Sequence, residues 1–195
     1  MTNTTDSSRF RRIRVLGIAG SLREGSYNKM LLRAATELAP QGMELTTFER
    51  LADVPLYNAD LDVGEGPEPV RALREAVSGA DALLIATPEY NYSVPGVLKN
   101  AIDWASRPPA TSPLRGMPAA IMGASTGVSG TMRAQLALRQ VLVFTQTYPL
   151  QAPEVIVARA AEKFNATGRL VDEKTRDVLR RHLESLVAWT RKLRG

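Results

Sequence analysis

Short apolar runs alternate with longer amphipathic segments along this chain. Brief apolar runs are typical of buried strands, whereas apolar residues that recur every three or four positions are typical of helices covering a sheet. On this pattern we predict strands at residues 13–19, 43–48, 80–87, 117–124 and 153–158. The intervening segments predict helices at residues 27–39, 67–78, 96–105, 130–144 and 172–193.

Strict alternation of strands and helices indicates the α/β class. We predict a three-layer, doubly wound fold around a five-stranded parallel sheet, because right-handed crossovers place helices on both faces. The strand order 2-1-3-4-5 is common at this size. Segment 80–87 is apolar almost throughout, so we expect it near the centre of the sheet.

Open parallel sheets bind ligands where loops leave the carboxyl ends of the strands. That rule selects the loops that follow Ala19, Thr87 and Ala124. If the fold is correct, these three loops lie at the same edge of the sheet, and each adds to the evidence from the others.

The first loop, residues 20–28, carries hydrogen-bond donors and a cation before a helix. Ser21, Ser26 and Asn28 can donate hydrogen bonds, and Arg23 offers a planar guanidinium that suits phosphate. The Lys-Ser or Lys-Thr pair of a Walker loop is absent from it. Hydroxyls and a guanidinium favour the terminal phosphate of a mononucleotide at the helix N-terminus. The alternative is an ordinary turn in which Ser26 caps the helix.

The second loop, residues 87–96, holds two prolines, two tyrosines and several polar groups. It could present backbone groups and an aromatic edge to a planar heterocycle, or it could be a polar connection whose tyrosines pack on the domain. The third loop, residues 123–130, is rich in Gly and Ser. Such residues allow a flat ligand to approach the backbone closely, although a plain turn has the same composition.

Composition excludes several kinds of chemistry. The 195 residues include no cysteine and one histidine, His182, so disulfides, thiolate catalysis and His-rich metal sites are not expected. We expect no catalytic side chain and no metal ligand, and we predict that His182 lies at the surface or an interface. Trp104 is expected in the core, with the site or an interface between copies of the chain as the alternatives.

The net charge of +5 is modest and concentrated at the chain ends. Without a basic stripe or a known motif it does not indicate nucleic-acid binding, although a positive field favours anionic small molecules. No apolar run is long enough to cross a membrane. We expect a cytoplasmic protein with a disordered tail at residues 1–12 and one domain at 13–195.

Four motifs resemble the NADPH-dependent FMN reductase family. They are GSLR at 20–23 followed by Ser26 and Asn28, PEYN at 88–91, KNAIDW at 99–104, and RAQLALRQVL at 133–142. The last is similar to the chromate and quinone reductase branch. The match runs from about residue 13 to the final helix, and it implies a flavodoxin-like fold with non-covalently bound FMN.

The resemblance implies roles for particular residues. The FMN phosphate is expected at Ser21, Arg23, Ser26 and Asn28. The isoalloxazine ring is expected against Pro88, Glu89, Tyr90 and Asn91, largely through their backbone, with Ser125 and Gly127 approaching from the third loop.

The resemblance also implies an activity. NADPH would give a hydride to bound FMN, which would pass electrons to a small-molecule acceptor such as a quinone, chromate, an azo compound or free flavin. Family members form homodimers or homotetramers. Two alternatives stay open: an FMN electron carrier that does not oxidise NADPH, which the positive charge disfavours, and a nucleotide-binding module without flavin.

Overall fold

The computed structural model describes residues 11–195. Its strands are β1 (Ile13–Ala19), β2 (Met43–Thr47), β3 (Ala82–Ala86), β4 (Pro118–Ala124), β5 (Tyr148–Pro149) and β6 (Val155–Val157). Its α-helices are α1 (Tyr27–Glu37), α2 (Glu68–Ser78), α3 (Gly96–Ala105), α4 (Met132–Phe144) and α5 (Glu173–Arg194). Short 3-10 turns occur at η2 (Leu51–Asp53), η3 (Ala59–Leu61) and η4 (Ala160–Glu162).

All strand pairs of the sheet are parallel, and the order is β2-β1-β3-β4-β5, with β6 also paired to β4. The predicted order 2-1-3-4-5 is therefore confirmed. Two short strands, β5 and β6, occupy the place of the predicted fifth strand. The sequence pattern predicted only β6. Proline has no N–H to donate; Pro149 ends β5, and Pro153 lies in the gap between β5 and β6.

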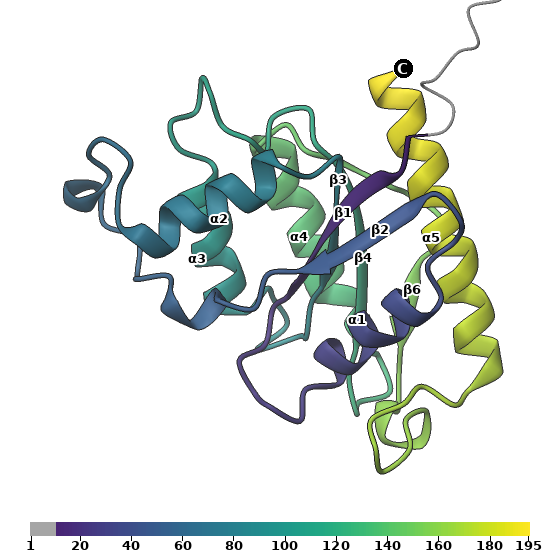
Figure 1. The fold of residues 1–195 in the computed structure, drawn as a ribbon. Coiled ribbons are helices and arrows are strands. Elements are labelled where there is room, and N and C mark those ends of the chain that lie inside the picture. Colours follow the sequence, from purple (N-terminus) through teal and green to yellow (C-terminus); the bar gives the residue numbers. More distant parts are fainter. Residues whose placement is uncertain (1–10) are drawn as a thin grey trace, which may run out of the picture.

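Helices cover both faces of the sheet, as Figure 1 shows. The core on one face lies beneath α1 and α5, and the core on the other lies beneath α2, α3 and α4. Every residue of β3 and β4 is buried, as expected of central parallel strands. The predicted three-layer arrangement is confirmed, and it leaves the strand ends free to carry loops.

The long connection between β2 and α2 is fastened to α3. Asn100 donates from Nδ2 to the Pro55 carbonyl and accepts at Oδ1 from the Tyr57 N–H, each at 2.8 Å. Trp104 donates from its indole N–H to the same Pro55 carbonyl at 2.8 Å. Trp104 is fully buried, as its predicted core position requires. The indole therefore fills the core and satisfies a loop carbonyl at once.

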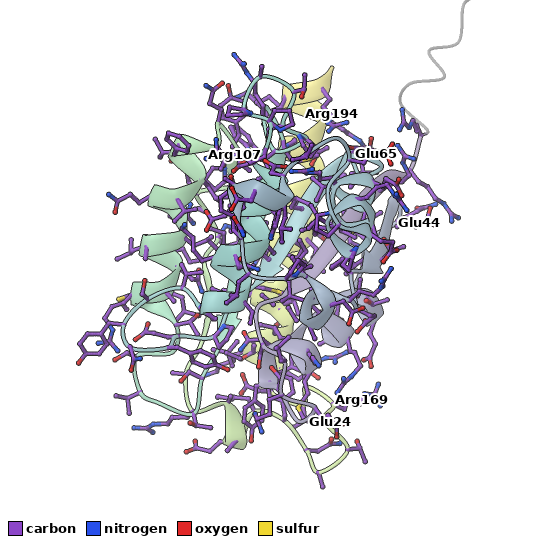
Figure 2. All side chains as sticks on the ribbon, turned by 90° about the vertical axis from the view of Figure 1, so that its left-hand side faces the viewer. Glu24, Glu44, Glu65, Arg107, Arg169 and Arg194 are labelled. Carbon is purple, nitrogen blue, oxygen red and sulfur yellow. The ribbon has the colours of Figure 1, made fainter. Side chains whose placement is uncertain are left out.

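Three arginines converge on one buried carboxylate at the amino edge of the sheet. Asp81 accepts from Arg11 at 3.1 Å and Arg194 at 3.3 Å, and from the Arg14 N–H at 2.9 Å. These bonds join both ends of the described chain to the start of β3. Of the predicted tail, residues 1–10 lie outside the described residues. Figure 2 shows Arg194 at the end of the molecule opposite Glu24.

The prediction that His182 lies at the surface or an interface is wrong, because the residue is buried. Its side chain is 1% exposed, and its Nδ1 lies 2.7 Å from the Pro153 carbonyl. His182 sits beside Leu179, Leu183 and Leu186 on the buried stripe of α5, so helical spacing carries it inward. No helix within residues 11–195 is long and apolar enough to span a membrane.

Burial makes the stability of the fold depend on His182 at acidic pH. Burial, chiefly, lowers the pKa of His182 from 6.5 to about 4, and the Arg139 charge adds to this. Between these values the unfolded chain binds the proton and the folded chain does not. The stability that neutral His182 contributes is therefore complete above pH 6.5 and is lost as the pH falls towards about 4.

We expect His182→Gln to flatten this dependence, because glutamine does not titrate. Between about pH 7 and about pH 5, the wild type should lose about 2 kcal/mol of unfolding free energy more than the variant. Urea denaturation at both pH values measures the difference. Equal losses in the two proteins would show that His182 does not carry the effect.

Candidate functional site

The three predicted loops meet in one open cavity of about 230 Å³ at the carboxyl edge of the sheet. Its walls come from the loops that follow β1, β3 and β4. The cavity therefore lies where open parallel sheets bind ligands, at the carboxyl ends of the strands. The lining residues are Ser21, Arg23, Ser26, Tyr27, Asn28, Pro88, Glu89, Tyr90, Ala124, Ser125 and Thr126. All predicted site residues line it except Asn91 and Gly127, which neighbour lining residues. Tyr27, Ala124 and Thr126 were not predicted.

Asn28 joins the first loop to the third. Its Nδ2 donates to the Ala124 carbonyl at 3.0 Å, and its Oδ1 accepts from the Ala124 N–H at 2.9 Å. Both bonds are buried, where an unsatisfied amide would be costly. Asn28 therefore holds two walls of the cavity together, and a ligand contact by its side chain stays a prediction.

The first turn of α1 faces the cavity. Ser26 is its N-cap and accepts through Oγ from the N–H groups of Asn28 and Lys29. The hydroxyl proton of Ser26 stays available to a ligand, because Oγ acts only as an acceptor in these bonds. A helix N-terminus attracts anions through its dipole and its free N–H groups. Capping and anion binding, the two alternatives in the sequence, are thus compatible.

Arg23 supplies positive charge without an ion-pair partner. Within residues 11–195 its guanidinium forms no salt bridge, and it lies 5.8 Å from the centroid of the Tyr27 ring. The side chain is exposed at the cavity. An exposed guanidinium beside two serine hydroxyls and a helix N-terminus is a donor set suited to a phosphate dianion.

The second loop presents Pro88 and Tyr90 to the cavity, whereas the Glu89 carboxylate is directed towards the start of α4. The Tyr90 hydroxyl lies 3.4 Å from Ser21 Oγ, across the cavity between the first and second loops. Asn91 follows in a tight turn, in the left-handed region with φ 49°. Arg133, which the carboxylate contacts, was identified only as part of a motif.

The third loop is shaped by close packing at Gly123. A Cβ at this position would overlap with Thr131 Oγ1 and with the Thr87 carbonyl oxygen. Only glycine fits there, so the ends of β3 and β4 and the start of α4 meet without a spacer. Ser125 Oγ accepts from the Gly127 N–H at 3.1 Å, which closes the turn beside the cavity.

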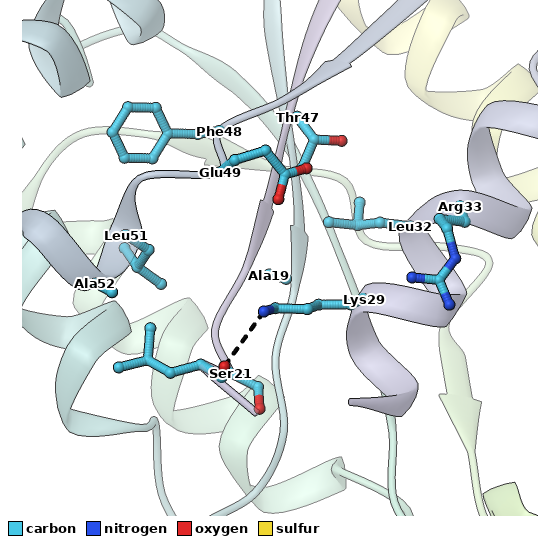
Figure 3. Close-up of a pocket in the computed structure, with 11 residues that line it drawn as sticks. Ala19, Ser21, Lys29, Leu32, Arg33, Thr47, Phe48, Glu49, Leu51 and Ala52 are labelled. Atoms are coloured by element: carbon cyan, nitrogen blue, oxygen red, sulfur yellow. Dashed lines mark hydrogen bonds between the residues drawn. The ribbon is translucent and has the colours of Figure 1, made fainter. Parts of the chain in front are cut away.

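A second cavity, of about 160 Å³, lies on the other side of the first loop. Figure 3 shows Lys29 reaching across it from α1, with its Nζ donating to the Leu22 carbonyl at 3.3 Å. Glu49 and Phe48 form part of the opposite wall. Lys29 therefore contacts the first loop from the side of this second cavity, which Arg23 does not line.

The model of a protein family described as NADPH-dependent FMN reductase matches residues 13–162. An NAD(P)H-dependent FMN reductase from Pseudomonas aeruginosa is 53% identical over 94% of this chain and 98% of its own. A quinone reductase from Escherichia coli K12 is 45% identical over 86% and 90%. The solved flavoenzyme NAD(P)H:acceptor oxidoreductase of Paracoccus denitrificans is 38% identical, with a TM-score of 0.83 over 92% of this chain and 98% of its own.

Proposed function

Because this chain belongs to the NADPH-dependent FMN reductase family, we propose that its cavity binds FMN and that it transfers electrons from NAD(P)H to quinones. The observation that carries the proposal is the convergence of three loops on one cavity beside Arg23, which forms no salt bridge with any residue in 11–195. Bound FMN supplies the redox chemistry, so the chain needs to bind and orient rather than react. The sequence contains no cysteine, so it offers no thiolate nucleophile, which agrees with a binding and orienting role.

The residues present fit the phosphate of FMN. Arg23 contributes a positive charge, and Ser21 and Ser26 contribute hydroxyls beside the N-terminus of α1. Among the described residues that line the cavity, only Glu89 has a carboxylate, and this group bonds to α4. An anion would therefore find donors and little repulsion.

The side of the cavity formed by the second and third loops fits a flat ring. It is lined by the rigid ring of Pro88, the aromatic edge of Tyr90 and the small side chain of Ser125. Tyr90 is 50% exposed and Tyr92 is 70% exposed, so the mouth is open to solvent. An open mouth leaves room for NAD(P)H and then for an acceptor, and it favours acceptors of varied shape. We also propose a cytoplasmic location, where NAD(P)H is supplied.

We expect the purified protein, incubated with FMN and then desalted, to retain the yellow flavin, and anaerobic NADPH to bleach it. Free flavin with an unrelated protein is the control for spontaneous bleaching. Flavin that stays yellow would instead support the electron carrier. A colourless protein with no steady-state reduction of free FMN would refute flavin chemistry altogether.

We expect Arg23→Ala to weaken FMN binding by about tenfold to a hundredfold, because it removes a charge-assisted hydrogen bond to phosphate. Titration of the apoprotein with FMN, followed by flavin fluorescence, measures the dissociation constant. Arg115→Ala is the matched control, since Arg115 is also exposed but precedes β4 at the amino edge. Equal dissociation constants for Arg23→Ala and the wild type would remove Arg23 from the site.

We propose that a second copy of the chain covers the exposed face of α4. Met132, Leu136 and Val143 fall within a narrow arc of this helix and are 50%, 59% and 74% exposed. Phe144, the last residue of α4, lies on an adjacent side of the helix and is 83% exposed. A self-associating apolar stripe on one helix is typical of a two-fold interface. A homodimer, or a homotetramer built from two such dimers, would bury it.

Leu136→Lys combined with Val143→Lys should shift the protein to monomers, since two charges would be buried in the interface. Size-exclusion chromatography with light scattering measures the mass. Val171→Lys is the control, because Val171 is 50% exposed away from α4. A double variant that keeps the wild-type mass would place the interface elsewhere.

A further inference from the structure

The loop that presents Pro88 and Tyr90 contains a strained two-residue turn. Tyr90 and Ser93 exchange two backbone hydrogen bonds of 3.1 and 3.0 Å around Asn91 and Tyr92. Both central residues are left-handed, with φ 49° and 65°. This is a type I′ turn, which favours Asn followed by Gly. Tyrosine in place of that glycine disfavours the turn, so an outside contact is needed to hold it.

Glu89 connects this loop to α4 by capping that helix. The N-cap residue Thr131 forms no side-chain cap of its own. Glu89 Oε2 accepts instead from the N–H groups of Arg133 and Ala134, at 3.0 and 3.2 Å. These are the second and third helical positions, which an N-cap side chain normally satisfies. The carboxylate is 7% exposed and complements the positive end of the helix.

Arg133 completes the link by contacting two residues of the loop, Glu89 and Tyr92. Its Nε donates to Glu89 Oε1 at 2.6 Å. Its guanidinium carbon lies 3.8 Å from the centroid of the Tyr92 ring. The planar group therefore stacks on the strained tyrosine while it is bonded to the carboxylate. This stacking explains how the turn tolerates tyrosine, because the ring gains a cation–π contact that glycine would lack.

We propose that Glu89 and Arg133 are positioning residues that fix the distance between the two loops expected to enclose the flavin ring. The proposal rests on the proposed function, in that the ring lies between the second and third loops. Glu89 and Tyr92 belong to the second loop, and α4 directly continues the third. The Glu89–Arg133–Tyr92 contacts therefore set the width of that gap. Neither side chain reacts.

Arg133→Ala should raise the FMN dissociation constant about tenfold and alter the absorption band shape of the flavin that still binds. The reason is that the tyrosine turn loses its stack and relaxes, which moves one wall of the ring site. Arg133→Lys keeps the charge but lacks the planar fork, so we expect a smaller loss in the same direction. Should the alanine variant fail to fold, the lysine variant provides the same comparison.

Tyr92→Gly separates positioning from ordinary stabilisation. Glycine adopts the left-handed region freely, so this turn no longer needs the stack. In the Tyr92→Gly background we expect Arg133→Ala to change the FMN dissociation constant less than twofold, which is a non-additive double-mutant cycle. Arg139→Ala is the matched control on the same helix, because Arg139 bonds to the Leu150 carbonyl, away from the cavity.

The outcomes are distinct. A tenfold loss that disappears with Tyr92→Gly supports the positioning role. The same loss in both backgrounds would overturn it, and so would a fall in melting temperature without change in FMN affinity or band shape, which is the pattern expected of Arg139→Ala. A wild-type protein that binds no FMN would refute the proposed function instead.

Discussion

The carboxyl edge of this sheet is held by one buried side chain that satisfies a distant backbone. Asn28 pairs both of its amide groups with the N–H and carbonyl of Ala124, a residue 96 positions further along the chain. An aspartate could not donate, and an apolar residue would leave two buried backbone groups unpaired. Because Ala124 ends β4 and Asn28 lies in the first turn of α1, this contact sets the spacing between the first and third loops, which both line the cavity.

The fold followed from the sequence because its signals are local. Apolar runs, helical spacing and the position of Pro and Gly are each read within about ten residues, and parallel sheets then limit the topology. The loop positions followed for the same reason, since the ends of β1, β3 and β4 could be recognised. The strand β5 was not predicted, and the reason is physical. Tyr148–Pro149 has only two residues, one of them proline, so it carries no strand pattern.

The roles of individual side chains were less predictable, because their partners are remote. Asn28 carries the same amide whether it binds phosphate or Ala124. The side chain that engages the Glu89 carboxylate, Arg133, lies 44 residues away in sequence. His182 was misplaced because a polar residue was assumed to face outwards. The flanking leucines of α5 were the available signal, since they place position 182 on the buried stripe.

The polar residues around the cavity are of two kinds. Some keep hydrogen-bonding groups that are available to a ligand, and others use these groups to bond to neighbouring loops. Arg23 and the Ser21 hydroxyl face the cavity with few protein contacts, whereas Asn28, Glu89 and Arg133 are committed to neighbouring loops. A protein whose cofactor supplies the chemistry requires such a division, because its contribution is the placement of that cofactor. The engaged residues are then as necessary as the free ones, since each free donor is useful only where the loop geometry places it.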